Sequence, residues 1–228
     1  MFHRRLSLLG AIALFALIAT GIALEHAAAL GLDRHCAPGA LARWLGYRSA
    51  PAVAFVAGAH RVAQIGDVLV LDERVLLARA TRLVGAAAMP DGIALLTADA
   101  LTVLDAAGNV VDRTALPSAA SALGRADGEL IADTAAGTFV FDRDLGSWTP
   151  ARAPNAAIDW VRAVAVDGDA QQRYDALYYA NAVTWSTALA AMHSGRIFGR
   201  HGGLIVDAAA LVLLAIALSG TWLARQRS

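Results

Sequence analysis

The chain has 228 residues with 19 basic and 19 acidic side chains, so its formal net charge at pH 7 is zero. Hydrophobic residues make up 57% of it and charged residues 17%, which lie respectively above and below the usual content of soluble proteins. This composition excludes a disordered chain and argues against a purely soluble globule, and the zero charge argues against a nucleic-acid partner. The single cysteine, Cys36, excludes an internal disulfide and a CxxC metal or redox motif.

The first predicted element is an apolar helix over residues 6–24, nineteen residues without a charge. At about 1.5 Å per residue this helix is about 28 Å long, close to the ~30 Å hydrocarbon thickness of a bilayer. Arg4 and Arg5 precede it, and Glu25 and His26 follow it. A cleaved signal peptide is the alternative, but its apolar core usually spans only ~7–15 residues, so we predict a retained transmembrane helix.

The central part of the chain contains predicted strands over about 52–150. Segments 91–111 and 127–146 each pair two apolar runs around a polar turn, and they align at an offset of 36 to 37 residues. A repeat of this size is typical of propeller blades, but a closed propeller needs at least ~4 blades and only two or three units fit here. We therefore predict a β-meander sheet with blade-like repeats.

Helices are predicted after the strands, over about 170–180 and 185–193, where helix-forming and spaced apolar residues follow one another. Thr184 can cap the second helix, because its hydroxyl can accept a hydrogen bond from a free N–H in the first turn. Four glycines between residues 194 and 203 end this helix. A second transmembrane helix is predicted over 204–224, followed by an arginine-rich tail at 225–228.

The arginines at both ends predict the topology, because short arginine-rich flanks of membrane spans stay cytoplasmic. Tails 1–5 and 225–228 are then cytoplasmic, and residues 25–203 form a periplasmic domain of a bacterial inner-membrane protein with the lipid bilayer as a partner. The predicted fold class is a membrane protein in which two transmembrane α-helices flank a mostly β extracytoplasmic domain with a short helical C-terminal part.

Histidines are the candidate site residues. The sequence contains no HExxH zinc motif, no GxSxG nucleophile motif and no glycine-rich nucleotide-binding motif, and it assigns no catalytic residue and no metal site. His26 follows the first predicted span, and His193 and, as a weaker candidate, His201 precede the second. These side chains are expected at one depth, where two imidazoles could ligate haem b. The alternative is that they are interfacial histidines, hydrogen-bonded to backbone or water.

Asp207 falls in the first turn of the second apolar run. A carboxylate there interacts favourably with the helix N-terminal dipole, and Arg196 or Arg200 is near enough to pair with it. We therefore predict a structural role for Asp207.

A motif at the C-terminal end is shared with a known family. Residues 192–226 contain His-Ser-Gly-Arg-x-x-Gly, then a helix with an early Asp and a late Ser-Gly-x-Trp; the positions concerned are His193, Ser194, Gly195, Arg196, Gly199, Asp207, Ser219, Gly220 and Trp222. The N-terminal segment 2–33 adds His3-Arg4, Thr20-Gly21 and Glu25-His26. These segments resemble the ends of PepSY-associated transmembrane proteins, over about 65 of the 228 residues. The chain departs from that family in having two predicted spans, Glu25 in place of Asn, and no PepSY module.

The resemblance implies haem or ferric-siderophore redox chemistry, with His26 and His193 as haem ligands. The first hypothesis is a small inner-membrane component that binds haem b and supports iron or ferric-siderophore reduction or uptake. The alternative is a non-catalytic scaffold whose exposed sheet edges bind a partner strand. Small residues in the terminal helices also permit close helix approach in a homodimer.

Overall fold

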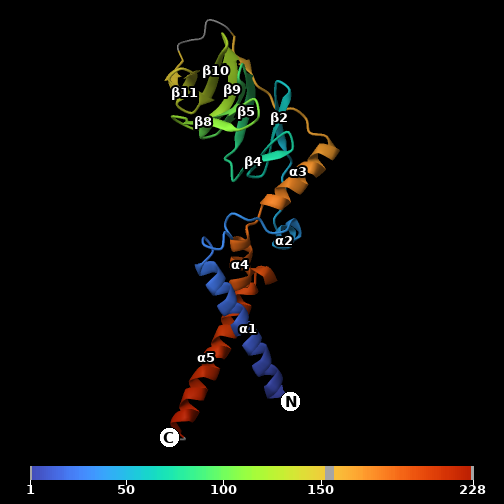
Figure 1. Ribbon diagram of the computed structural model, residues 1–228, viewed down its shortest axis with the longest axis vertical. Coiled ribbons are helices and arrows are strands. Elements are labelled where there is room, and N and C mark those ends of the chain that lie inside the picture. The colour runs from blue at the N-terminus through green and yellow to red at the C-terminus, as the bar shows by residue number, and fades with distance from the viewer. Residues whose placement is uncertain (1, 152–156, 227–228) are drawn as a thin grey trace. The chain divides into compact units, whose positions relative to one another are not determined.

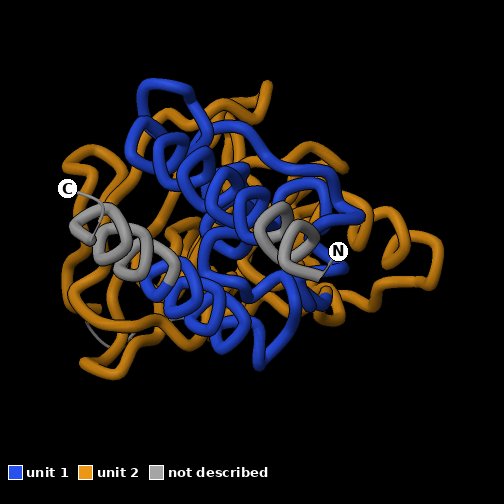
Figure 2. Tube along the Cα trace, turned by 90° about the horizontal axis from the view of Figure 1, so that it is seen from below, with its two compact units in different colours: residues 1–48, 179–228 blue, residues 49–178 orange. Residues whose placement is uncertain are grey.

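The computed structural model describes the backbone of residues 2–151 and 157–226 and the side chains of residues 10–151 and 157–215. The chain divides into two compact units (Figure 2). Unit 1 combines the two ends of the chain, residues 1–48 and 179–228, and unit 2 is the continuous segment 49–178. The described chain is mostly β-sheet with several helices.

Unit 2 contains three antiparallel sheets in its described residues, each built from strands that follow one another along the chain (Figure 1). The first sheet comprises β1 (Val53–Ala57), β2 (His60–Ile65), β3 (Val68–Leu71) and β4 (Arg74–Ala78). The second comprises β5 (Leu83–Met89), β6 (Gly92–Thr97), β7 (Ala100–Asp105) and β8 (Val110–Ala115). The third comprises β9 (Ala120–Ala126), β10 (Glu129–Thr134), β11 (Gly137–Asp142) and β12 (Ser147–Pro150), and β13 (Asp159–Trp160) pairs with β9.

Residues that align in the sequence repeat occupy equivalent turns of the second and third sheets. The Thr97 hydroxyl donates to a carbonyl at the start of β7 over 2.9 Å, and the Thr134 hydroxyl donates to one at the start of β11 over 2.7 Å. Asp105 and Asp142 each accept hydrogen bonds from two backbone N–H groups of the turn that follows. Short polar side chains therefore close the same turns in both sheets, which is why their spacing repeats in the sequence.

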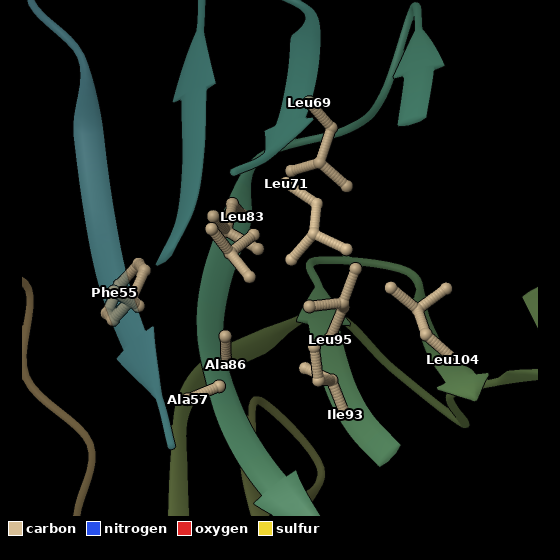
Figure 3. Close-up of a cluster of buried hydrophobic side chains, with 10 residues drawn as sticks. Phe55, Ala57, Leu69, Leu71, Leu83, Ala86, Ile93, Leu95 and Leu104 are labelled. Carbon is tan, nitrogen blue, oxygen red and sulfur yellow. The ribbon is translucent and has the colours of Figure 1, made fainter. Parts of the chain in front are cut away.

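The second sheet is buried on both faces along β5, β6 and most of β7, because this part packs between the other two sheets, whereas its outer strand β8 is exposed. Its strand β5 contacts β1 on one side and β9 on the other. Along β6, Ile93 and Leu95 belong to the core shared with the first sheet (Figure 3), whereas Ala94 and Leu96 belong to the core shared with the third. Successive strand residues point to opposite faces, so a sheet with two buried faces has continuous apolar strands.

A short segment after β12 joins the third sheet to the first. In this closing segment, residues 158–164, the Val161 N–H donates to the Leu123 carbonyl of β9, and the Val164 N–H donates to the Ala54 carbonyl of β1. Val161 packs against both hydrophobic cores. Strands β1, β5 and β9 and the closing segment thus form a ring of contacts. Gly124 of β9 makes room for the segment, because a Cβ there would lie 2.5 Å from Ile158 Cγ2.

Helix α3 (Gly168–Asn181) follows the closing segment and is fixed to the first sheet by three contacts within unit 2. Gln171 Oε1 accepts a hydrogen bond from the backbone N–H of Ala52 over 2.8 Å. Arg173 Nε donates to Glu73 Oε1 over 2.6 Å. The buried Tyr178 ring packs on Gly66, where a Cβ would approach within 2.9 Å. The helix predicted over about 170–180 is confirmed.

Unit 1 is helical in its described residues. Its elements are α1 (Phe2–Glu25), α2 (Gly39–Trp44), α4 (Trp185–His193), the 3-10 turn η1 (Arg196–Phe198) and α5 (Gly202–Gln226). α1 contacts α4 and α5. The Thr184 hydroxyl accepts a hydrogen bond from the Thr187 N–H over 3.3 Å, so the predicted N-cap of α4 is confirmed.

The expectation that α1 and α5 span a membrane is not supported by their described parts. In these parts, no helix has both the length and the apolarity that a membrane crossing requires. The predicted fold class, a membrane protein with spans at 6–24 and 204–224, is therefore wrong. The periplasmic placement of residues 25–203 follows from those spans and loses that support.

Replacing Gly85 tests the packing of β5 against β9. A Cβ at Gly85 would lie 2.7 Å from the Leu123 Cβ, which is a backbone-linked atom that cannot rotate away. We expect Gly85→Ala to lower the free energy of unfolding by about 1–3 kcal/mol, as overpacked cores do. Chemical denaturation followed by far-UV circular dichroism measures it. Gly168→Ala is the matched control, because a Cβ there meets no atom within 4 Å; equal losses in the two variants would contradict the packing described here.

Candidate functional site

A pocket of about 450 Å³ lies within unit 1, between the helices that the two ends of the chain contribute. Its volume is in the range of small-molecule sites, which is ~300–1,000 Å³. The lining residues come from α1, α2, the end of α4, η1 and the start of α5; they are Ala13, Ala16, Leu17, Thr20, Trp44, Met192, Ile197, Phe198, Ile205, Val206 and Ala209. Apart from the Thr20 hydroxyl and the Trp44 indole N–H, these side chains carry no nitrogen or oxygen. The pocket therefore suits an apolar ligand.

The wall formed by α1 follows from helical spacing. Ala13, Ala16, Leu17 and Thr20 recur at intervals of three and four residues, so they share one face of the helix. The two alanines are small, which leaves space beside α1 instead of filling it. The pocket was not predicted, and this spacing of small residues on one helix face is the sequence signal that could have indicated it.

Thr20 links the pocket to His193. Thr20 is buried, with 8% of its surface exposed. Its Oγ1 lies 2.7 Å from the Ala16 carbonyl oxygen, 3.2 Å from the Leu17 carbonyl oxygen and 3.0 Å from His193 Nδ1. The half-buried imidazole also lies over Gly21, where a Cβ would be 3.4 Å from His193 Cε1. The structure thus attaches one of the predicted site histidines to the pocket wall.

Residues 194–199 of the predicted family motif lie in the reversal between α4 and α5. Gly195 has a left-handed backbone (φ +73°), and a Cβ there would lie 2.3 Å from the Gly202 carbonyl oxygen. Arg196 Nε donates to Ser194 Oγ over 3.2 Å, and Gly199 is also left-handed (φ +86°). At Gly195, only glycine suits both the left-handed backbone and the close approach to Gly202. The motif therefore has a structural account: it turns the chain so that η1 and α5 reach the pocket.

The other predicted site residues lie apart from the pocket lining. His26 and His201 are exposed, and neither has a side-chain hydrogen bond among the described residues. His26 is six residues beyond Thr20, which is about 9 Å along the helix axis. In the described part of the chain, no three His, Cys, Asp or Glu side chains are grouped to hold a metal ion. The side chains of His3 and Arg4 fall outside the described residues.

Asp207 differs from its predicted environment. α5 begins at Gly202, so Asp207 lies in the second turn of the helix and not in the first, where the dipole interaction is strongest. Its side chain is exposed, and among the described residues no ion pair joins it to Arg196 or Arg200. The predicted dipole and ion-pair role is therefore wrong.

Compared with known proteins, the chain matches no family model, no curated protein and no solved structure. The resemblance to PepSY-associated transmembrane proteins therefore stays a prediction. Any function of the chain has to follow from the geometry of its own residues.

Unit 2 holds a charged cluster at the β3–β4 turn, outside the pocket. Asp72 Oδ2 lies 2.5 Å from His60 Nδ1, and Asp72 Oδ1 accepts a hydrogen bond from the Arg61 N–H over 2.8 Å. Burial disfavours the charged carboxylate, but the Arg61 N–H and the His60 imidazole outweigh this, so the pKa of Asp72 lies below its ordinary value of 3.8. Asp72 has a positive φ of 45°. These contacts stabilise the turn, and we assign the cluster a structural role.

The lowered pKa of Asp72 predicts how stability depends on pH. Because the pKa falls on folding, the contribution of Asp72 is present above about pH 4 and is lost as the pH falls through the folded-state pKa. We expect Asp72→Asn to be less stable than the wild type at pH 7, and the difference to vanish between about pH 5 and pH 2. Urea denaturation at several pH values measures it.

Asp127→Asn is the control for the backbone of this turn. Asp127 also has a positive φ, 53°, but its side chain has no hydrogen bond among the described residues. A pH-independent loss in Asp72→Asn, or the same pH dependence in both variants, would contradict the assigned role of Asp72.

Proposed function

We propose that unit 1 binds haem b in the apolar pocket, with His193 as the ligand of the iron. The observation that carries the proposal is the 3.0 Å contact between His193 Nδ1 and Thr20 Oγ1, because Thr20 is itself part of the pocket wall. Haem sites in proteins combine an apolar slot with at least one axial side chain, most often an imidazole. Bound haem supplies a one-electron redox centre, which is the chemistry that iron or ferric-siderophore reduction or uptake requires.

The apolar side chains of the pocket lining support an apolar ligand such as the haem macrocycle. Alanines on α1 leave space beside the helix, and aliphatic side chains of η1 and α5 complete an apolar wall. Two aromatic side chains of the lining, Trp44 and Phe198, are 61% and 63% exposed. Their rings can stack on a flat aromatic ligand and cover it from water, which also accounts for their exposure in the free protein.

The proposal uses His193 alone and differs in this from joint ligation by His26 and His193. Neither histidine is itself among the pocket-lining residues, but His193 contacts the lining residue Thr20. His26 lies beyond the end of α1, is exposed and makes no side-chain hydrogen bond among the described residues. His193 would then be the one protein ligand of the iron, and the apolar lining residues would shield the bound group from water. His26 consequently serves as the matched control for His193.

Haem titration of the purified full-length chain tests the proposal. We expect the wild type and His26→Ala to develop a Soret band with one equivalent of haem. His193→Ala removes the iron ligand itself, so its affinity should fall by more than the ~10–100-fold that loss of an outer-shell partner typically costs. A Soret band that stays at the position of free haem in the wild type, or unchanged affinity in His193→Ala, would exclude this function.

A second function is favoured by the outer strand of the second sheet. β8 is hydrogen-bonded to β7 on one side only, and its Val110 and Val111 side chains are 54% and 66% exposed. An edge strand with exposed apolar side chains can accept an additional strand from a partner protein. This observation supports the scaffold hypothesis, in which unit 2 binds a partner and has no catalytic role.

Lysine substitution at the edge tests the scaffold function. We expect Val111→Lys to abolish strand addition, because a charged edge position disfavours strand pairing. Affinity purification from the native organism measures it, with Val53→Lys as the control because Val53 is also an exposed strand valine (46%). A partner retained by the wild type and by Val53→Lys but lost by Val111→Lys is the expected result. Equal recovery with all three proteins would rule out β8 as the docking edge.

A further inference from the structure

We infer that Thr20 is a positioning residue for His193: it holds the imidazole proton on Nδ1 and thereby leaves Nε2 with a free lone pair. The inference describes the protein without any ligand. Its functional meaning rests on the proposed function, because Nε2 is then the atom available to the iron.

Thr20 Oγ1 makes three polar contacts but has only one hydrogen of its own. A hydroxyl has one hydrogen to donate and two lone pairs that accept. The carbonyl oxygens of Ala16 and Leu17 can only accept, and the Ala16 oxygen is the nearer at 2.7 Å. The Thr20 hydrogen therefore points to Ala16, as threonine hydroxyls in helices commonly do. The 3.0 Å contact with His193 Nδ1 then has a hydrogen only if Nδ1 carries it.

The opposite arrangement is disfavoured by burial. If the Thr20 hydroxyl donated to a bare Nδ1, two oxygen atoms would face each other over 2.7 Å with no hydrogen between them. Thr20 is only 8% exposed, so bulk water has little access to its hydroxyl oxygen. The Nδ1–H form places one hydrogen in each of the two short contacts of Thr20 Oγ1, whereas the opposite form leaves the 2.7 Å oxygen–oxygen contact without one, so the Nδ1–H form is favoured.

This arrangement is the one that metal-binding histidines use. Such histidines usually donate the N–H of one ring nitrogen to a neighbouring acceptor, which fixes the ring and leaves the other nitrogen for the metal. In unit 1 the acceptor is a helix hydroxyl from the opposite end of the chain, 173 residues away. The ring also lies against α1 beside Gly21, where a Cβ would be in ordinary van der Waals contact with it.

The chain contains its own reference for the predicted tautomer. His35 Nδ1 lies 2.8 Å from the Gly31 carbonyl oxygen, which can only accept, so His35 also carries its proton on Nδ1. His35 belongs to unit 1 but lies away from Thr20 in sequence. Its ring resonances therefore report both the Nδ1–H form and the integrity of unit 1.

Long-range ¹H–¹⁵N correlation spectra of the full-length protein without haem test the inference, with His193 assigned through His193→Gln. The spectra are recorded at about pH 8.5, where ordinary histidines are neutral. We expect His193 to show a protonated Nδ1 and an unprotonated Nε2, as His35 does. Thr20→Ser keeps the hydroxyl and should retain this pattern. Thr20→Val has the same shape without the hydroxyl, so both His193 nitrogens should shift toward the averaged values of two exchanging tautomers.

A wild-type His193 protonated on Nε2 would overturn the inference, whether or not the variants fold. Unchanged His193 resonances in Thr20→Val, with His35 also unchanged, would overturn it as well. Haem titration separates this result from the proposed function: Thr20→Val should bind haem ~10–100-fold more weakly than the wild type and Thr20→Ser. The predicted tautomer in a wild type that binds no haem would refute the proposed function and leave the positioning role intact.

Discussion

Close approach at positions that lack a side chain is the constraint on which both units depend. In unit 2, Gly85 allows β5 to approach β9, and Gly124 allows the closing segment to lie against β9. In unit 1, the backbones of Gly195 and Gly202 touch where the chain reverses, and a Cβ on Gly202 would lie 1.6 Å from the Gly195 carbonyl oxygen. At each of these contacts the nearest atoms belong to backbone or to packed side chains, so they cannot move aside cheaply.

Local features of the fold could be predicted from the sequence, because they depend on neighbouring residues. Thr184 caps α4 through a bond to a residue three positions away, and the paired aspartates of the repeat close turns within their own hairpins. Features set by distant contacts could not be predicted in this way. The closing segment contains a strand of only two residues, β13, which is too short to show an alternating pattern.

The error over the terminal helices has a related cause. Long apolar runs indicate segments that are buried, but composition alone does not specify whether lipid or other parts of the protein cover them. The length of the apolar runs predicts membrane spans, whereas no helix in the described residues is both long and apolar enough for a crossing. The candidate site was predicted in part: His193 was singled out by position, but its partner Thr20 lies 173 residues away and has no pattern that links it to a histidine.

Unit 1 is assembled from the two ends of one chain, and this arrangement sets an order of assembly during synthesis on the ribosome. α1 emerges before the three sheets, whereas its partners α4, η1 and α5 emerge after them. The three sheets and the closing segment are complete before that point, and domains generally fold as units as they leave the ribosome. In the nascent chain, the three sheets can therefore fold before the helices that pack against α1 have been synthesised. Translation that stops early leaves this apolar helix uncovered, so truncated chains of this protein are natural clients for chaperones.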